Sequence, residues 1–242
     1  MKEKILQTGW IKWVVTFALA LMLTGLWGNG VKAAIGVYSN GSTYTTVQKG
    51  TWPNVKTVIY RQKDGQSKKK LKTVTGSAYP CFEYKNVLYY EKDRKDDPTC
   101  IDLWSVNLKT LKVKKVFSNA TARAYSGKYA VLMPNTGAVI PLPCHVYNLS
   151  TGKAKLLTSD CLSANIYNNK IYFAKATGSY VANKGWKVRI YRTNLSGSGK
   201  KAVSGYFYAM GVEKITSKSV IIYKGSNTYR YSFSTKKSTK IA

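Results

Sequence analysis

From about residue 37 onward, short runs of aromatic and β-branched residues alternate with polar stretches rich in Asn, Gly, Ser and Lys. Such runs, bounded by turn residues and without a sustained apolar spacing of three and four, are typical of β-strands rather than helices. One kind of segment combines an aromatic run, a polar turn and a lysine-rich strand, and its copies span 58–74, 102–118, 145–159, 189–204 and 228–242. A second kind, dense in Val, Ile and Tyr, precedes most of these copies at 85–90, 126–133, 168–173 and 216–223.

The spacing of the copies predicts the architecture. Equivalent positions are separated by 45, 41, 46 and 38 residues, and they are Lys63, Leu108, Leu149, Leu195 and Phe233. A period of about 40–45 residues is the size of one four-stranded propeller blade. The pattern therefore predicts an all-β, propeller-like single domain of four to five blades over residues 34–242. The repeats are expected at approximately 37–76, 80–120, 122–160, 163–204 and 206–242.

One copy carries the clearest family resemblance. Its two segments read NNKIYF at 168–173 and RIYRTNLSGSGKKAV at 189–203. They resemble the strand and hairpin of bacterial extracellular propeller repeats related to the TolB-like and low-density-lipoprotein-receptor-type propellers. The resemblance covers about residues 37–242 and is specific in this copy, and it implies the same propeller fold.

The glycine-rich stretch at 196–199 invites comparison with a phosphate-binding loop. Such a loop needs glycines at both ends of a four-residue gap, followed by Lys and then Ser or Thr. Here Asn194 stands five positions before Gly199, and Lys200 is followed by Lys201. The stretch is therefore expected to be the hairpin turn between the two outer strands of a blade, where Gly accepts positive φ at little cost.

Residues 1–33 have the pattern of a secretory signal peptide. A basic start is followed by an apolar run at 13–27 and by small residues that end at Ala33. The run of about 15 residues is shorter than the roughly 20 needed to span a bilayer, so we expect cleavage after Ala33 and no transmembrane span afterwards. The alternative is an uncleaved anchor. Export predicts a secreted protein that is extracellular or associated with the cell wall.

The charge of the chain is strongly positive. It is +29 overall, and it falls to +26 when residues 1–33, with four lysines and one glutamate, are removed. Such a field attracts polyanions over roughly 8–10 Å at physiological salt. The predicted partner is an anionic cell-wall polymer, an acidic glycan or a protein, and export argues against nucleic acid as the natural partner. A lysine-rich solvated surface without a partner is the alternative.

Four cysteines lie after residue 33, and an even number in an exported chain favours two disulfides. Pairing of Cys81 with Cys100 and of Cys144 with Cys161 closes loops of about twenty residues, each worth roughly 3 kcal/mol by the chain-entropy estimate. No pair has C-x-x-C spacing, and the chain has one histidine, His145, so no zinc or redox site is predicted.

Catalysis is not predicted either. A glycoside hydrolase on this fold needs two carboxylates near the propeller axis. The segments assigned as inner strands, NVLYY, KYAVLM, KIYFAK and SVIIY, have no acidic residue, and the nearest candidates are Glu83, Glu91 and Glu213. His145 lies in a strand-like run, where a surface or edge position is expected, without a recognisable nucleophile or orienting group.

Acidic residues cluster instead between 91 and 102. They are Glu91, Asp93, Asp96, Asp97 and Asp102. A calcium loop is conceivable, but the spacing matches no known loop and basic residues intervene. A solvated mixed-charge loop is the expected reading, with no metal and no cofactor.

Binding is the function class that remains. Most aromatic side chains are expected in the blade core. The segments 177–188 and 204–211 are the exceptions, and their candidate ligand-binding residues are Tyr180, Lys184, Trp186, Lys187, Tyr206 and Tyr208. The sequence thus predicts a secreted, non-catalytic binding module that associates with the cell envelope or anionic glycopolymers. A glycan-active propeller enzyme and a structural repeat of a larger secreted assembly are the alternatives.

Overall fold

The computed structural model describes residues 36–135 and 139–241, and the predicted signal peptide lies outside them. The described residues form strands and turns without an α-helix, and none of them builds an apolar helix of membrane-spanning length. The strands are β1 Gly36–Ser39, β2 Ser42–Lys49, β3 Lys56–Lys63, β4 Lys69–Thr75, β5 Ala78–Tyr84, β6 Val87–Asp93, β7 Ile101–Asn107, β8 Val113–Phe117, β9 Thr121–Ser126, β10 Tyr129–Met133, β11 Leu142–Asn148, β12 Lys153–Tyr167, β13 Lys170–Val181, β14 Gly185–Asn194, β15 Lys201–Ala202, β16 Phe207–Ala209, β17 Gly211–Ile215, β18 Ser219–Lys224, β19 Asn227–Ser232 and β20 Ser238–Lys240.

The strands pair antiparallel in chain order, as in propeller blades. Three four-stranded sheets are β1–β4, β5–β8 and β17–β20, and a larger sheet runs from β9 to β15 with β16 paired to β14. The larger sheet is continuous because β12 is shared. Residues 153–158 of β12 pair with β11, and residues 163–167 pair with β13. We call the five resulting groups units 1 to 5: β1–β4, β5–β8, β9 to the first half of β12, the second half of β12 to β16, and β17–β20.

The first strand of each unit is the innermost one. Contacts between the first strands of neighbouring units join β1 to β5, β9 to β12 and β12 to β17, whereas units 2 and 3 meet where β7 contacts β9. The sequence interpretation of the inner strands was therefore wrong. The segments NVLYY, KYAVLM, KIYFAK and SVIIY are second strands, belonging to β6, β10, β13 and β18.

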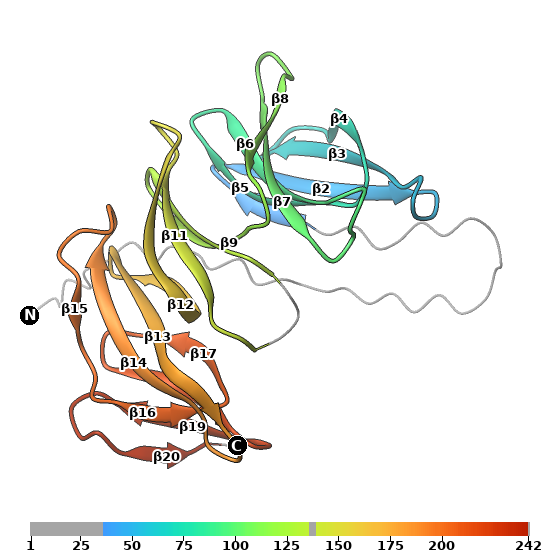
Figure 1. Ribbon diagram of the computed structural model, residues 1–242. Helices are drawn as coiled ribbons and strands as arrows, with labels where there is room; N and C mark the ends of the chain where they lie inside the picture. The colour runs from blue at the N-terminus through green and yellow to red at the C-terminus, as the bar shows by residue number, and fades with distance from the viewer. Residues whose placement is uncertain (1–35, 136–138, 242) are drawn as a thin grey trace, which may run out of the picture.

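The hydrophobic core is divided among the interfaces between successive units. Units 1 and 2 bury Tyr44, Ile59 and Tyr90 together, and units 3 and 4 bury Leu157 and Phe173 together. Equivalent clusters join units 2 and 3 and units 4 and 5. In Figure 1 the units follow one another along an open arc, with unit 1 (blue) and unit 5 (red) at opposite ends.

Two families of turns recur. The turns between first and second strands use left-handed residues, for example Asn40 with Gly41 and Asn168 with Asn169. Such pairs fit the primed turns that suit the twist of a hairpin. The turns between third and fourth strands, which we call the outer hairpins, include residues 196–199. There Gly197 (φ +74°) and Gly199 (φ +62°) connect β14 to β15, so the hairpin prediction is confirmed.

Candidate functional site

A cavity of about 920 Å³ lies among the innermost strands of units 3, 4 and 5. Strands β9, β12 and β17 form its walls together with residues on either side of the β10–β11 connection. Its apolar lining includes Met133, Leu142 and Leu162, and its charged lining consists of Arg123, Glu213 and Lys214. We call this space the axial cavity.

The polar groups of the axial cavity are only partly engaged. The Arg123 guanidinium donates to the Pro134 carbonyl at 3.3 Å, and the Glu213 carboxylate accepts from the Tyr223 hydroxyl at 2.6 Å, which raises the pKa of Tyr223. The Asn165 amide donates to the Ile215 carbonyl at 2.8 Å, while its own buried oxygen has no partner among the described residues. With two cations, one carboxylate and several apolar side chains in its lining, the cavity suits a mixed polar and apolar ligand.

The six candidate ligand-binding residues divide between two faces of unit 4. Trp186 and Lys187 are consecutive in β14, so their side chains point to opposite faces of the sheet. Trp186 packs edge-on against Tyr180 with ring centroids 5.5 Å apart, and its indole nitrogen donates to the Val139 carbonyl at 3.3 Å. Because Val139 lines the axial cavity, Trp186 lies next to that cavity. Lys184 is exposed in the β13–β14 turn.

The other face gathers a cationic aromatic group. Lys187 Nζ lies 4.9 Å from the centre of the Tyr206 ring, and the Arg189 guanidinium lies 5.1 Å from the same centre. Tyr208 pairs with Lys187 across β14 and β16 and is exposed. The sequence reading missed Arg189, although its spacing of two from Lys187 in a strand was the signal that both share one face.

Glu83 is structural rather than catalytic. Its carboxylate is fully buried on β5 and forms an ion pair with Arg61 at 3.3 Å. It also accepts hydrogen bonds from the Tyr44 hydroxyl and from the Asn40 amide, the latter at 3.2 Å, while its backbone amide donates to Ser39 Oγ at 2.9 Å. We call this group the Arg61–Glu83 network. Because it joins units 1 and 2, an alanine at Glu83 tests stability and not catalysis.

The acidic segment at 91–102 is satisfied internally. Asp96 pairs with Arg94, and Asp97 accepts from the Thr99 amide at 2.9 Å and from its hydroxyl at 2.6 Å. These hydrogen bonds lower the pKa of Asp97 to about 2. Within the described ranges no group of three His, Cys, Asp or Glu side chains is placed to hold a metal ion.

Two further acidic residues of this segment are partly or fully buried. Glu91 accepts from the Ala122 amide at 3.0 Å, and burial raises its pKa. Asp102 pairs with Lys115 at 2.8 Å and accepts from the Asn119 amide at 2.9 Å. Both carboxylates hold strands and turns together and are poorly placed to reach a substrate.

The four cysteines are free thiols, so the expected disulfides are not formed in this structure. Cys81 lies on β5 beside Glu91, and the Cys100 thiol donates to Asp97 at 3.1 Å. Cys144 and Cys161 are buried neighbours on β11 and β12, and Cys161 donates to the Ser163 carbonyl at 3.2 Å.

His145 packs between strands and against an aromatic ring. It lies on β11, between β10 and β12, rather than on an edge strand. Its ring is 5.2 Å from that of Phe117, and burial lowers its pKa. Packing against the Phe117 ring gives His145 a structural role.

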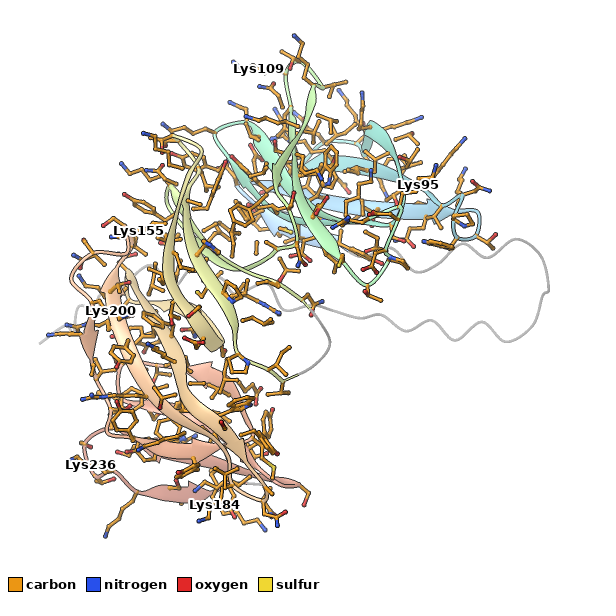
Figure 2. All side chains as sticks on the ribbon, in the orientation of Figure 1. Lys95, Lys109, Lys155, Lys184, Lys200 and Lys236 are labelled. Carbon is orange, nitrogen blue, oxygen red and sulfur yellow. The ribbon has the colours of Figure 1, made fainter. Side chains whose placement is uncertain are left out.

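Lysines dominate the outer strands and outer hairpins. Figure 2 shows Lys109, Lys155, Lys200 and Lys236 along the arc. Lys109, Lys200 and Lys236 lie in outer hairpins, and Lys155 lies in β12, just after one. All four are exposed, and strands β4, β8, β15 and β20 contain no carboxylate. Among the described residues, Lys115 is the one lysine held in an ion pair.

Comparison with solved structures supports the fold. The β-propeller domain of the Trilobed protease from Pyrococcus furiosus matches with a TM-score of 0.55 at 11% identity, over 88% of this chain and 72% of that one. The acylaminoacyl peptidase of Pyrococcus horikoshii matches with a TM-score of 0.54 at 10% identity, over 87% and 40%. TolB from Acinetobacter baumannii gives a TM-score of 0.44 at 15% identity, over 77% and 49%.

The two matches with TM-scores above 0.5 show the fold alone: the chain has a β-propeller fold. It spans less than half the length of the acylaminoacyl peptidase and TolB chains. No protein-family model matches the sequence, and no curated protein does. The Trilobed protease match is to a propeller domain, and a propeller domain by itself does not indicate catalysis.

Proposed function

We propose that the protein is a secreted, non-catalytic binding module that holds an anionic glycopolymer of the cell envelope along its outer hairpins. The observation that carries the proposal is the row of exposed lysines that have no ion pair among the described residues and lie in or directly after successive outer hairpins, with Lys109, Lys155, Lys200 and Lys236 as its representatives. An extended polyanion can contact several such sites at once, so weak single contacts add through a high effective concentration.

The row has a second physical reading. Lysines on edge strands also block edge-to-edge pairing between protein molecules. That reading explains lysines within β4, β8 and β20, where the strand edge is open. It does not require the lysines at the tips of the hairpins, such as Lys109 and Lys236, which lie beyond the paired strands. Polymer binding accounts for both positions.

The enzymatic alternative is weaker on chemical grounds. Glycoside hydrolysis uses two carboxyl groups about 5–9.5 Å apart. Glu213 is the one carboxylate in the lining of the axial cavity, and Glu83 is enclosed in an ion pair. A further alternative, a structural repeat of a larger assembly, predicts a protein partner and no polymer affinity.

The test compares two triple variants of the purified protein that remove the same charge. Lys109, Lys155 and Lys236 are changed to Gln in one variant, and Lys49, Lys184 and Lys224, which lie away from the outer hairpins, in the other. Cosedimentation with cell walls, before and after removal of teichoic acid, is measured across a salt series. Each lysine that contacts an anion contributes roughly one unit to the slope of log affinity against log salt, by analogy with nucleic acid.

We expect the outer-hairpin variant to lose about two to three units of slope and at least tenfold affinity, and the control variant to lose far less. Equal losses in the two variants would show that only the net charge matters. Salt-resistant binding to stripped walls would contradict the proposal and favour a specific glycan or protein partner.

A further inference from the structure

A second, smaller cavity lies between units 1 and 2, away from the axial cavity. Its volume is about 210 Å³. The loop between β2 and β3, the β4–β5 connection and the end of β6 form its walls, and the lining comprises Trp52, Pro53, Asn54, Val55, Lys56, Thr75, Gly76, Ser77, Lys92, Asp93, Arg94 and Lys95. We call it the Trp52 cavity.

The walls are fixed by the fold. The Gly76 amide donates to the Val55 carbonyl at 2.7 Å within unit 1, and the Asp93 amide at the end of β6 donates to the Ser77 carbonyl of the β4–β5 connection at 3.1 Å. These hydrogen bonds fix the backbone of the three wall segments relative to one another. Gly76 has φ +87°, and a Cβ at this position would approach Lys92 Cε to 3.3 Å. Glycine therefore leaves room for the Lys92 side chain to cross the connection.

Trp52 is unusual among the residues that line the cavity because it is a large hydrophobic residue that is exposed. The loop around it turns tightly, with the Asn54 amide donating to the Thr51 carbonyl at 2.8 Å. Trp52 as a whole residue is 55% exposed, although tryptophan is highly buried on average. The general expectation that the tryptophans of this chain pack in the blade core therefore fails at Trp52. An exposed aromatic face at the mouth of a cavity is a stacking surface for a ring.

The remaining wall is cationic. Lys56 and Lys95 are exposed and belong to no ion pair among the described residues. Lys92 lies half-buried beside Trp104, with its Nζ 4.8 Å from the ring centre. Asp93 is the one carboxylate of the lining, and Asp96 neutralises Arg94. The cavity thus has an excess of positive charge that an anionic group can offset.

We propose that the Trp52 cavity binds one anionic sugar unit, a six-membered sugar ring that carries a phosphate or carboxylate group. The ring stacks on Trp52 and the anionic group lies between Lys56 and Lys95. The volume is below the roughly 300–1,000 Å³ of a drug-sized pocket, so a single unit enters and the rest of a polymer stays outside. The inference rests on the proposed function, because the cavity would bind a single sugar unit of the anionic glycopolymer.

Small probes separate this site from the polymer-binding row. Ligand-observed NMR saturation transfer and titration calorimetry on the purified protein would use glucose 6-phosphate, glucuronate, glucose and inorganic phosphate. We expect glucose 6-phosphate or glucuronate to bind in the millimolar range, with saturation of the ring protons, and glucose and inorganic phosphate to bind at least tenfold more weakly. Comparing the phosphate with the carboxylate probe identifies the anionic group.

Variants locate the binding. Trp52→Ala and the Lys56→Gln/Lys95→Gln pair should each weaken the bound probe at least tenfold. Tyr208→Ala, which removes an exposed ring elsewhere, and Lys49→Gln, which removes a nearby exposed charge, should leave the affinity within twofold. Because Trp52 and both lysines are exposed, thermal unfolding of these variants is expected to match that of the unmodified protein.

The site proposal is overturned if neither anionic sugar binds at 10 mM, if Trp52→Ala binds them unchanged, or if glucose or inorganic phosphate binds equally well. If only the outer-hairpin variant loses cosedimentation with cell walls, and Trp52→Ala keeps both wall binding and probe binding, the proposed function is retained and the Trp52 cavity is rejected as a site. Loss of probe binding on Trp52→Ala with no wall binding by any form would retain the cavity and reject the proposed function.

Discussion

The interface between units 1 and 2 and the interface between units 3 and 4 solve the same stacking problem with different chemistry. The first encloses the Arg61–Glu83 network beside its apolar cluster, whereas the second is sealed by side chains such as Leu157 and Phe173 up to the outer hairpin. An enclosed ion pair constrains which side chains can meet but leaves a buried charge if one partner is lost. Close apolar packing does not depend on a charged partner, but it has no room for an additional atom, so added volume lowers stability. This difference can be tested by removing one partner of the ion pair at the first interface and by adding volume at the second.

The largest effect is expected at the Arg61–Glu83 network. Glu83→Ala leaves the nearly buried Arg61 guanidinium without its carboxylate, and removing one partner of a buried pair costs about 3–5 kcal/mol. Urea unfolding should show this loss as a lower midpoint. Glu213→Ala is the matched control because Glu213 is an exposed acid on another innermost strand, and its cost should stay within about 0.5 kcal/mol.

A double variant sharpens this prediction. Arg61→Met combined with Glu83→Leu removes both charges and retains apolar volume, so it should recover a large part of the stability lost in Glu83→Ala. If the double variant is as unstable as Glu83→Ala, the shape and hydrogen bonds of the network, and not its uncompensated charge, determine the cost.

The second effect is steric and belongs to the interface of units 3 and 4. Gly197→Ala places a Cβ 2.8 Å from Leu157 Cδ2 and 2.9 Å from Val146 Cγ1 at a left-handed position. Backbone strain and overpacking together should cost about 2–4 kcal/mol. Gly65→Ala has a similar φ of +71° with no atom within 4 Å of the added Cβ, so it should cost only about 1 kcal/mol in the same unfolding assay. Equal costs would mean that strain alone acts at Gly197.

The contrast between these glycines shows what the sequence could predict. Both stand in polar turns after an aromatic run, and the turn at 196–199 was predicted from that pattern. The approach of Gly197 to Val146 and Leu157 depends on how unit 3 stacks on unit 4, which a local pattern does not contain. The all-β propeller fold followed from the spacing of the repeats because each repeat is one set of hairpins.

Less of the candidate site than of the fold could be predicted from the sequence. The innermost strands were missed because β9 and β17 are largely polar and β5 carries Pro80 and Glu83, whereas the conspicuous Val- and Tyr-rich runs are the second strands. Trp186 and Lys187 were grouped by proximity in the sequence, although strand geometry separates them. Trp52 was assigned to the core on its residue type, and only the position of its loop shows that it is exposed.

The third effect concerns the outer hairpins and is smaller. Asn148 Oδ1 accepts from the Ser150 amide at 3.0 Å and from the Thr151 amide at 3.3 Å. Asn148→Ala removes this local acceptor and should cost about 1 kcal/mol, while Asn148→Asp keeps it and should cost less. Ser232 accepts a single amide hydrogen bond, from Thr235 at 3.4 Å, so Ser232→Ala should cost the least in parallel thermal unfolding. A larger loss at Ser232 would contradict a role for these acceptors in hairpin stability.

The smallest effect depends on pH and lies between units 2 and 3, where the apolar cluster is accompanied by a buried carboxyl group, that of Glu91, rather than by an ion pair. Burial raises the pKa of Glu91 above its value of about 4.3 in an unfolded chain. Its favourable contribution is therefore fully present below pH 4.3 and is lost as the pH rises through the folded-state pKa. Glu91→Gln keeps an oxygen that accepts from the Ala122 amide but does not ionise.

The difference in unfolding free energy between the unmodified protein and Glu91→Gln should then shift in favour of the variant between pH 4 and pH 7. Asp97→Asn supplies a control of opposite sign. The pKa of Asp97 is lowered to about 2, so its contribution is present above about pH 3.9 and is lost as the pH falls towards 2. Urea unfolding at a series of pH values should show the two variants diverging from the unmodified protein in different pH windows. A flat difference for Glu91→Gln across this range would mean that the interface of units 2 and 3 is held, like that of units 3 and 4, by apolar packing alone.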